Sequence, residues 1–85
     1  MANLGQFKIQ KEDNYKNMSD LMAFEDGKTY TLQIQNPASI QSASATPTSG
    51  GFYINKPDIF TFTKKEGENL YIKAEAFFIV VNVAD

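Results

Sequence analysis

The chain has 85 residues, of which 42% are hydrophobic, and its formal net charge is -2. A chain of this length buries only about 60–65% of its unfolded surface, so we expect a single domain over residues 1–85. It contains no Cys and no His, which excludes disulfides, thiolate metal sites and a histidine general base. All its cationic residues are Lys. Because Lys lacks the bidentate fork that suits phosphate and guanine, we expect no nucleic-acid partner.

Nothing in the sequence predicts a targeting or membrane segment. The N-terminus has no basic stretch followed by an apolar run, so we expect no signal peptide. The longest apolar run, residues 76–81, is far shorter than the roughly 18–20 residues that span a bilayer. We therefore expect no membrane partner and a cytosolic site of synthesis.

The N-terminal third predicts one short strand and one short helix. Phe7 and Ile9 alternate with polar residues, as in a strand, and the charged residues 11–16 predict a loop. Residues 17–24 favour one or two helical turns capped by Asn17 or Ser19. A short strand over residues 21–24 is the alternative.

The clearest element is a strand between Gly27 and Asn36. Tyr30, Leu32 and Ile34 alternate strictly with Thr and Gln, which is typical of a strand with one buried face and one wet face. Asp-Gly before this stretch and Asn-Pro after it are turn signals. Residues 37–51 consist almost entirely of Ser, Ala, Thr, Pro and Gly, and predict a flexible loop with at most a weak strand near residues 40–44.

Three further strands are expected in the C-terminal half, over residues 52–55, 59–63 and 70–74. Each shows the two-residue alternation of apolar and polar side chains. Gly67 can supply the positive φ that the charged hairpin turn between the last two requires. With turns spaced this closely, the expected fold is mainly β, a small antiparallel β-sandwich or barrel of six to seven strands with one short helix.

The last expected strand, residues 77–83, is apolar on both faces apart from Asn82. Either it lies at the centre of a sheet that is covered on both sides, or one of its faces contacts another subunit. The second interpretation makes Phe78, Val80 and Asn82 candidate interface residues and predicts a homo-oligomer.

No group of residues forms a recognisable catalytic or metal site, so we expect no enzyme activity, no cofactor and no metal. Gly27-Lys28-Thr29 resembles the end of a phosphate-binding loop, but Met22 stands where its first Gly belongs and a strand follows. The close carboxylate pairs, in residues 25–26 and in residues 66 and 68, fall in predicted turns, where solvent equalises their environments. A calcium loop starting at Asp13 fails because non-ligands occupy its key positions.

Tyrosines offer an alternative role in binding. Tyr15, Tyr53 and Tyr71 could form a stacking platform for a sugar or single-stranded nucleic acid. Tyr53 and Tyr71, with the loop of residues 42–51, are the candidate site of a carbohydrate- or peptide-binding module. The absence of Trp and Arg weakens this hypothesis, and the Phe residues alternate with polar residues as core residues do.

The chain resembles a group of small bacteriophage structural proteins. The resemblance rests on Gly27, Tyr30, Gln33 and Asn36 in the pattern Gly-x-x-Tyr-x-x-Gln-x-x-Asn, followed by a Ser/Pro-rich stretch and a closing aromatic strand pair, and it covers residues 17–83. It implies a non-enzymatic virion or assembly component that acts as a symmetric oligomer, alone or with other structural proteins. The implied location is the virion or the cytoplasm of a bacterial host. The alternative function is a carbohydrate- or peptide-binding β module.

Overall fold

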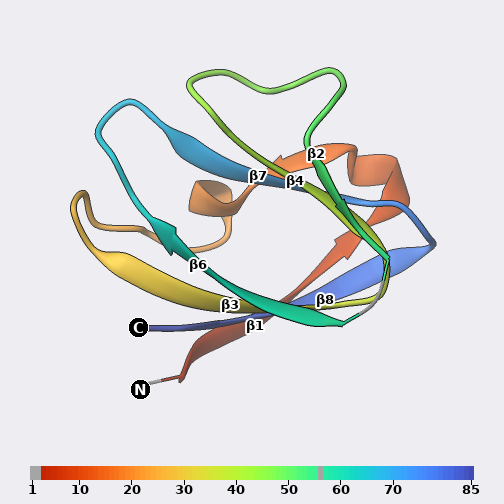
Figure 1. The fold of residues 1–85 in the computed structure, drawn as a ribbon, viewed down its shortest axis with the longest axis horizontal. Coiled ribbons are helices and arrows are strands. Elements are labelled where there is room, and N and C mark those ends of the chain that lie inside the picture. Colours follow the sequence, from red (N-terminus) through yellow and green to blue (C-terminus); the bar gives the residue numbers. More distant parts are fainter. Residues whose placement is uncertain (1–2, 56) are drawn as a thin grey trace.

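The computed structural model describes residues 3–55 and 57–85 (Figure 1). These residues contain eight strands and two short 3-10 turns, joined by loops. The strands are β1 (Asn3–Gln10), β2 (Tyr15–Asn17), β3 (Thr29–Gln35), β4 (Ala38–Ala43), β5 (Phe52–Ile54), β6 (Asp58–Thr63), β7 (Asn69–Ala74) and β8 (Phe78–Ala84). The turns are η1 (Lys11–Asp13) and η2 (Met18–Asp20). The mainly β, antiparallel fold is confirmed, with eight strands in place of six to seven and 3-10 turns in place of a helix.

The strands form two four-stranded sheets that pack as a sandwich. Sheet A has the strand order β1-β8-β3-β6 and sheet B the order β2-β7-β4-β5. Every neighbouring pair is antiparallel. In Figure 1, β3, β8 and β1 lie in one layer and β4 and β7 in the other. Because the chain passes repeatedly from one sheet to the other, most hydrogen-bonded neighbours are distant in the sequence.

The core lies between the two sheets. Strand β3 contributes Tyr30, Leu32 and Ile34, each at most 2% exposed, on the face that the sequence alternation predicts. Tyr30 also packs edge-on against Phe24, with the ring centroids 4.6 Å apart. Its hydroxyl accepts a hydrogen bond of 2.8 Å from the backbone N–H of Glu25, so the polar end of this buried ring is satisfied.

Strand β8 lies at the centre of sheet A, between β1 and β3. Its inward residues Ile79, Val81 and Val83 are at most 1% exposed. Its other face carries Phe78 and Val80 on the outside of the sandwich. The apolar run is thus explained on one side by a central position over the core, while nothing in the described part of the chain covers the other side.

Within the loop expected over residues 37–51, the weak strand expected near residues 40–44 is present as strand β4, which begins two residues earlier and is a full member of sheet B. This strand lies between β7 and β5 and places Ala38 and Ile40 in the core, at 0% and 9% exposure. Ala and Ser have weak strand propensity, but a central position in a sheet overrides it. The loop that remains is residues 44–51.

The expected loop over residues 11–16 and helix over residues 17–24 are also corrected. Strand β2 pairs Tyr15 with Lys73 and Asn17 with Tyr71, and the turn η2 follows it. Asn17 does cap this turn, because its side chain accepts a hydrogen bond of 2.9 Å from the backbone N–H of Ser19. Strand β2 has only three residues, which are too few for an alternation of apolar and polar side chains to be visible in the sequence. The completely buried Met18 explains why the turn docks against the core.

Candidate functional site

The most extensive candidate site is the outward surface of sheet A, which we call the sheet A outer face. Residues directly opposite each other in an antiparallel pair point to the same side of a sheet, so the strand registers define its members. They are Asn3, Gln6, Lys8, Gln10, Thr29, Thr31, Gln33, Gln35, Ile59, Thr61, Thr63, Phe78, Val80, Asn82 and Ala84. None of these residues is buried.

The sheet A outer face is almost uncharged. Charged residues make up 21% of the chain, yet among the members of this face only Lys8 carries a charge. The Nζ of Lys8 lies 4.5 Å from the ring centroid of Phe78, which places the cation over an aromatic face. Uncharged amides, hydroxyls and apolar side chains make up the rest, a composition more typical of the centre of an interface than of a solvated surface.

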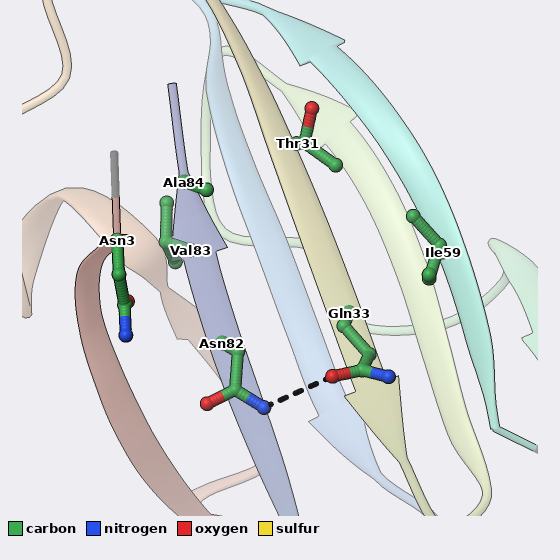
Figure 2. A pocket seen from close by; sticks show the side chains of 7 residues that line it. All are labelled: Asn3, Thr31, Gln33, Ile59, Asn82, Val83 and Ala84. Atoms are coloured by element: carbon green, nitrogen blue, oxygen red, sulfur yellow. Dashed lines mark hydrogen bonds between the residues drawn. The ribbon is translucent and has the colours of Figure 1, made fainter. Parts of the chain in front are cut away.

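Polar side chains on this face bond to one another across the strands. The amide nitrogen Nδ2 of Asn82 donates to Oε1 of Gln33 at 3.3 Å, joining β8 to β3 (Figure 2). The hydroxyl oxygens of Thr29 and Thr63 lie 2.8 Å apart and join β3 to β6. These contacts join the side chains of neighbouring strands across the surface of the sheet.

The sheet A outer face is hollowed at the end of β8 that carries Ala84. The hollow has a volume of about 320 Å³ and is lined by Asn3, Thr31, Gln33, Ile59, Asn82, Val83 and Ala84 (Figure 2). Thr31 and Ala84 are small and lie opposite each other on β3 and β8, which explains why the floor is low there. Ile59, which is 61% exposed, stands at one side on β6.

The structure brings together the three interface residues predicted from the sequence. Phe78, Val80 and Asn82 follow one another along the outward side of β8. Phe78 is 37% exposed. Val80 and Asn82 are partly covered by their neighbours in the sheet. The sequence did not indicate the other members of the face, because its alternation shows which residues point outward but not which strands are neighbours.

The three tyrosines of the alternative site also share one surface, the outward side of sheet B. The register runs from Tyr15 through Lys73 and Ser39 to Tyr53 across the four strands, and Tyr71 lies in the next row. Tyr15 and Tyr71 are buried, at 7% and 4% exposure, whereas Tyr53 is 62% exposed. Only Tyr53 is therefore available as an open stacking surface.

Tyr15 holds the loop of residues 44–51 against sheet B. Its hydroxyl donates a hydrogen bond to the backbone carbonyl of Gly50, and Ser39 donates one to the carboxylate of Glu75 in the same region. Burial raises the pKa of the Tyr15 hydroxyl above its usual 10.0; a hydrogen bond with Ser39 opposes this rise and the negative charge of Glu75 adds to it. No local sequence signal could have indicated this contact, which joins residues 35 positions apart.

A second hollow, of about 370 Å³, lies beside this contact. It is lined by Asn14, Tyr15, Thr46, Pro47, Thr48 and Lys73. Its polar side chains are those of Lys73, Thr46, Thr48 and Asn14, together with the hydroxyl of the buried Tyr15, which is already bonded to Gly50. They form no cluster of converging buried groups.

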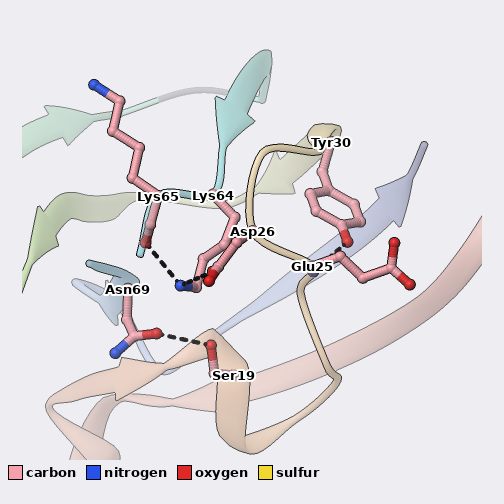
Figure 3. A network of polar contacts seen from close by, with 7 residues as sticks. All are labelled: Ser19, Glu25, Asp26, Tyr30, Lys64, Lys65 and Asn69. Atoms are coloured by element: carbon pink, nitrogen blue, oxygen red, sulfur yellow. Dashed lines mark hydrogen bonds and ion pairs between the residues drawn. The ribbon is translucent and has the colours of Figure 1, made fainter. Parts of the chain in front are cut away.

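The carboxylate pairs that the sequence drew attention to, Glu25 with Asp26 and Glu66 with Glu68, are exposed and lie in or beside turns. The Nζ of Lys64 lies 2.9 Å from Oδ1 of Asp26 and donates to the backbone carbonyl of Lys65 at 2.8 Å (Figure 3). Lys28, beside the Gly27 turn, forms an ion pair of 3.5 Å with Asp85. Within residues 3–55 and 57–85, no three His, Cys, Asp or Glu residues come together in a way that could hold a metal ion.

Comparisons with known proteins add nothing to what the sandwich fold itself shows. The chain matches no protein-family model, and no curated protein or solved structure is significantly similar to it. In the described part of the chain, the helical segments are too short to span a membrane.

Proposed function

We propose that this protein is a non-enzymatic structural or interaction protein that acts by self-association through the sheet A outer face. The observation that carries the proposal is the position of β8. This strand is central in its sheet, its inward side is in the core, and its outward side presents Phe78 and Val80 to solvent in an almost uncharged surface. A surface of this kind with no further role would be expected to carry more charge.

The size of the face is compatible with a specific contact. Four strands about 4.8 Å apart, each with about seven residues at about 3.4 Å per residue, present about 450 Å² in projection. Two such faces cover about 900 Å², and the relief of the side chains raises the accessible area toward the roughly 1,200 Å² at which specific interfaces begin. A second copy also fits the charge of the face, because it brings only one further cation.

The resemblance to small bacteriophage structural proteins points the same way. It favours a virion or assembly component, with a second copy or other structural proteins as partners, in the virion or in the cytoplasm of a bacterial host. The pattern of Gly27, Tyr30, Gln33 and Asn36 on which it rests surrounds β3, which contributes Thr31, Gln33 and Gln35 to the proposed contact surface.

The alternative function, binding of a carbohydrate or peptide by surface tyrosines, has less support. Tyr71 is buried, and the exposed Tyr53 lies beside the exposed Phe52 on β5, a three-residue strand at the edge of sheet B. Two neighbouring side chains of one strand point to opposite sides of a sheet, so they do not form a joint platform.

The test is the solution mass, measured by light scattering over a range of concentrations, for the wild type and for Phe78→Lys. We expect an oligomeric wild type, and an association at least about tenfold weaker in Phe78→Lys, because a desolvated lysine costs more than about 1.4 kcal/mol. Phe52→Lys is the matched control, since Phe52 is 81% exposed and lies on the other sheet. It should associate as the wild type does.

Three results would contradict the proposal. They are a monomeric wild type at all concentrations, an unaffected Phe78→Lys, and dissociation by Phe52→Lys alone. Circular dichroism checks that each variant is folded. If Phe78→Lys does not fold, Asn82→Lys introduces the same charge on the same face at a partly exposed position.

A further inference from the structure

We infer that two copies pack with their sheet A outer faces together and their β8 strands antiparallel, so that Phe78 of each copy enters the hollow beside Ala84 of the other. The inference rests on the proposed function and specifies its geometry. The partner that occupies the sheet A outer face is a second copy of this chain.

The outward side of β8 changes in size from one end to the other. Its residues are Phe78, Val80, Asn82 and Ala84 in order, from a large aromatic ring to a methyl group. The hollow of about 320 Å³ lies over Ala84 and Thr31 and has room for an aromatic ring. Phe78 and this hollow are six residues apart on one strand, or about 20 Å at 3.4 Å per residue.

Symmetry relates the aromatic ring to the hollow. Two identical faces pack against each other about a twofold axis that lies in the plane between them. If the axis crosses the strands at the level of Val81, midway between Phe78 and Ala84, each ring comes over the other copy's hollow. If the axis instead runs along β8, the two Phe78 rings meet and both hollows face each other unfilled. The first arrangement fills the space that the second leaves empty.

The polar residues also find partners in the crossed arrangement. Lys8 lies opposite Val80 in the sheet, and Gln6 lies opposite Asn82. Because the axis exchanges the row of Val80 with the row of Asn82, Lys8 of one copy comes over Gln6 of the other. The amide oxygen of Gln6 can accept a hydrogen bond from the ammonium group, and the two Lys8 side chains do not meet.

The test uses opposite charges placed at the two ends of β8. Phe78→Lys and Ala84→Glu are prepared separately, and each should associate at least tenfold more weakly than the wild type. In a one-to-one mixture, the crossed arrangement places the ammonium group introduced by Phe78→Lys over the carboxylate introduced by Ala84→Glu at one end, and keeps the native contact at the other. Native mass spectrometry should then detect a mixed dimer whose affinity is at least tenfold above that of either variant alone.

The control mixture is Phe78→Glu with Ala84→Glu, which brings like charges together at the same end. It should not recover association. A wild-type oligomer that both single substitutions weaken, but that the mixture of opposite charges does not restore, would overturn the crossed arrangement and leave the proposed function standing. Recovery in both mixtures would overturn it as well, whereas a monomeric wild type would remove the proposed function itself.

Discussion

Gly51 lies just before β5, under the hydroxyl of Tyr15, in a space that has no room for a side chain. Its φ is +102°, and a Cβ built on it would lie 2.7 Å from the hydroxyl oxygen of Tyr15 and 2.8 Å from the backbone oxygen of Ile40. Gly50, its neighbour, has a similar φ of +83° but meets nothing within 4 Å. Substitutions at Gly50 and Gly51 therefore distinguish the free-energy cost of a positive φ alone from the cost of a positive φ combined with a steric clash.

We predict that Gly51→Ala lowers the free energy of unfolding by about 2–3 kcal/mol, because it adds a backbone clash to the strain of a positive φ. Gly50→Ala should lose only about 1 kcal/mol, from the strain alone. Urea unfolding of the two variants measures the difference. Equal losses would show that the loop moves freely away from Tyr15.

Tyr15 gives stability a dependence on alkaline pH. Burial raises the pKa of its hydroxyl in the folded protein above 10.0, the value that applies when the chain is unfolded. Between these two values the folded state binds more protons than the unfolded state. The contribution is therefore complete below about pH 10 and is lost as the pH rises through the folded pKa.

We predict that wild type and Tyr15→Phe differ in this pH dependence. At neutral pH, Tyr15→Phe should lose about 1 kcal/mol, because the carbonyl of Gly50 loses its donor. Above about pH 10, the stability of the wild type should fall more steeply than that of the variant. The comparison cancels the titration of lysines, which both proteins share. Parallel curves of unfolding free energy against pH would contradict the prediction.

At the scale of the element, β8 combines two faces with different functions. Ile79 is 0% exposed in the core, whereas Val80 is partly exposed on the sheet A outer face. We predict that Ile79→Ala lowers the free energy of unfolding by about 2–5 kcal/mol, from lost burial and an internal cavity. Val80→Ala should lose less than about 1 kcal/mol in dilute solution.

Chemical denaturation at a concentration where the protein is dissociated measures both values. Light scattering at higher concentration then separates the two roles, since Val80→Ala should weaken association more than it weakens folding. A large loss of unfolding free energy in dilute Val80→Ala would place this side chain in the internal core.

At the scale of the whole molecule, the two outer surfaces of the sandwich differ in how far other parts of the chain cover them. Sheet B buries Tyr15 and Tyr71 on its outward side, and Tyr15 is bonded to Gly50 of the loop. Sheet A is without such a cover in the part of the chain that the structure describes. The sandwich therefore has one almost uncharged face that no described residue covers, and association is proposed there.

The edges of sheet A are less suited to association than its face. Strand β1 has an irregular register at Asn3 and Gly5 and carries Lys8 on the sheet A outer face, features that discourage pairing with another strand. Strand β6 begins at the exposed Asp58, and a charge at the end of an edge strand discourages pairing with another strand. Contact through the face avoids both edges.

Local pattern was sufficient to predict much of this architecture. The alternation around Leu32 predicted both the strand and its buried side, because a strand whose side chains alternate must place them on opposite faces. The same reasoning applied to residues 59–63 and 70–74. It did not predict β2, which is too short to alternate. It predicted only a weak strand near β4, because Ala and Ser have low strand propensity and the strand is stabilised by its position between two others.

By itself, the sequence determined that the protein is an antiparallel β protein, and it indicated that Phe78, Val80 and Asn82 share one side of the last strand. Only the tertiary structure decided that this strand is central, that Gln33 and Thr31 of β3 lie beside it, and that the hollow at Ala84 completes the surface. It also decided that Tyr15 and Tyr71 are covered. The physical reason is that alternation is set by the geometry of one strand, whereas strand order, and hence the exposed surface, depends on contacts between residues far apart in the chain.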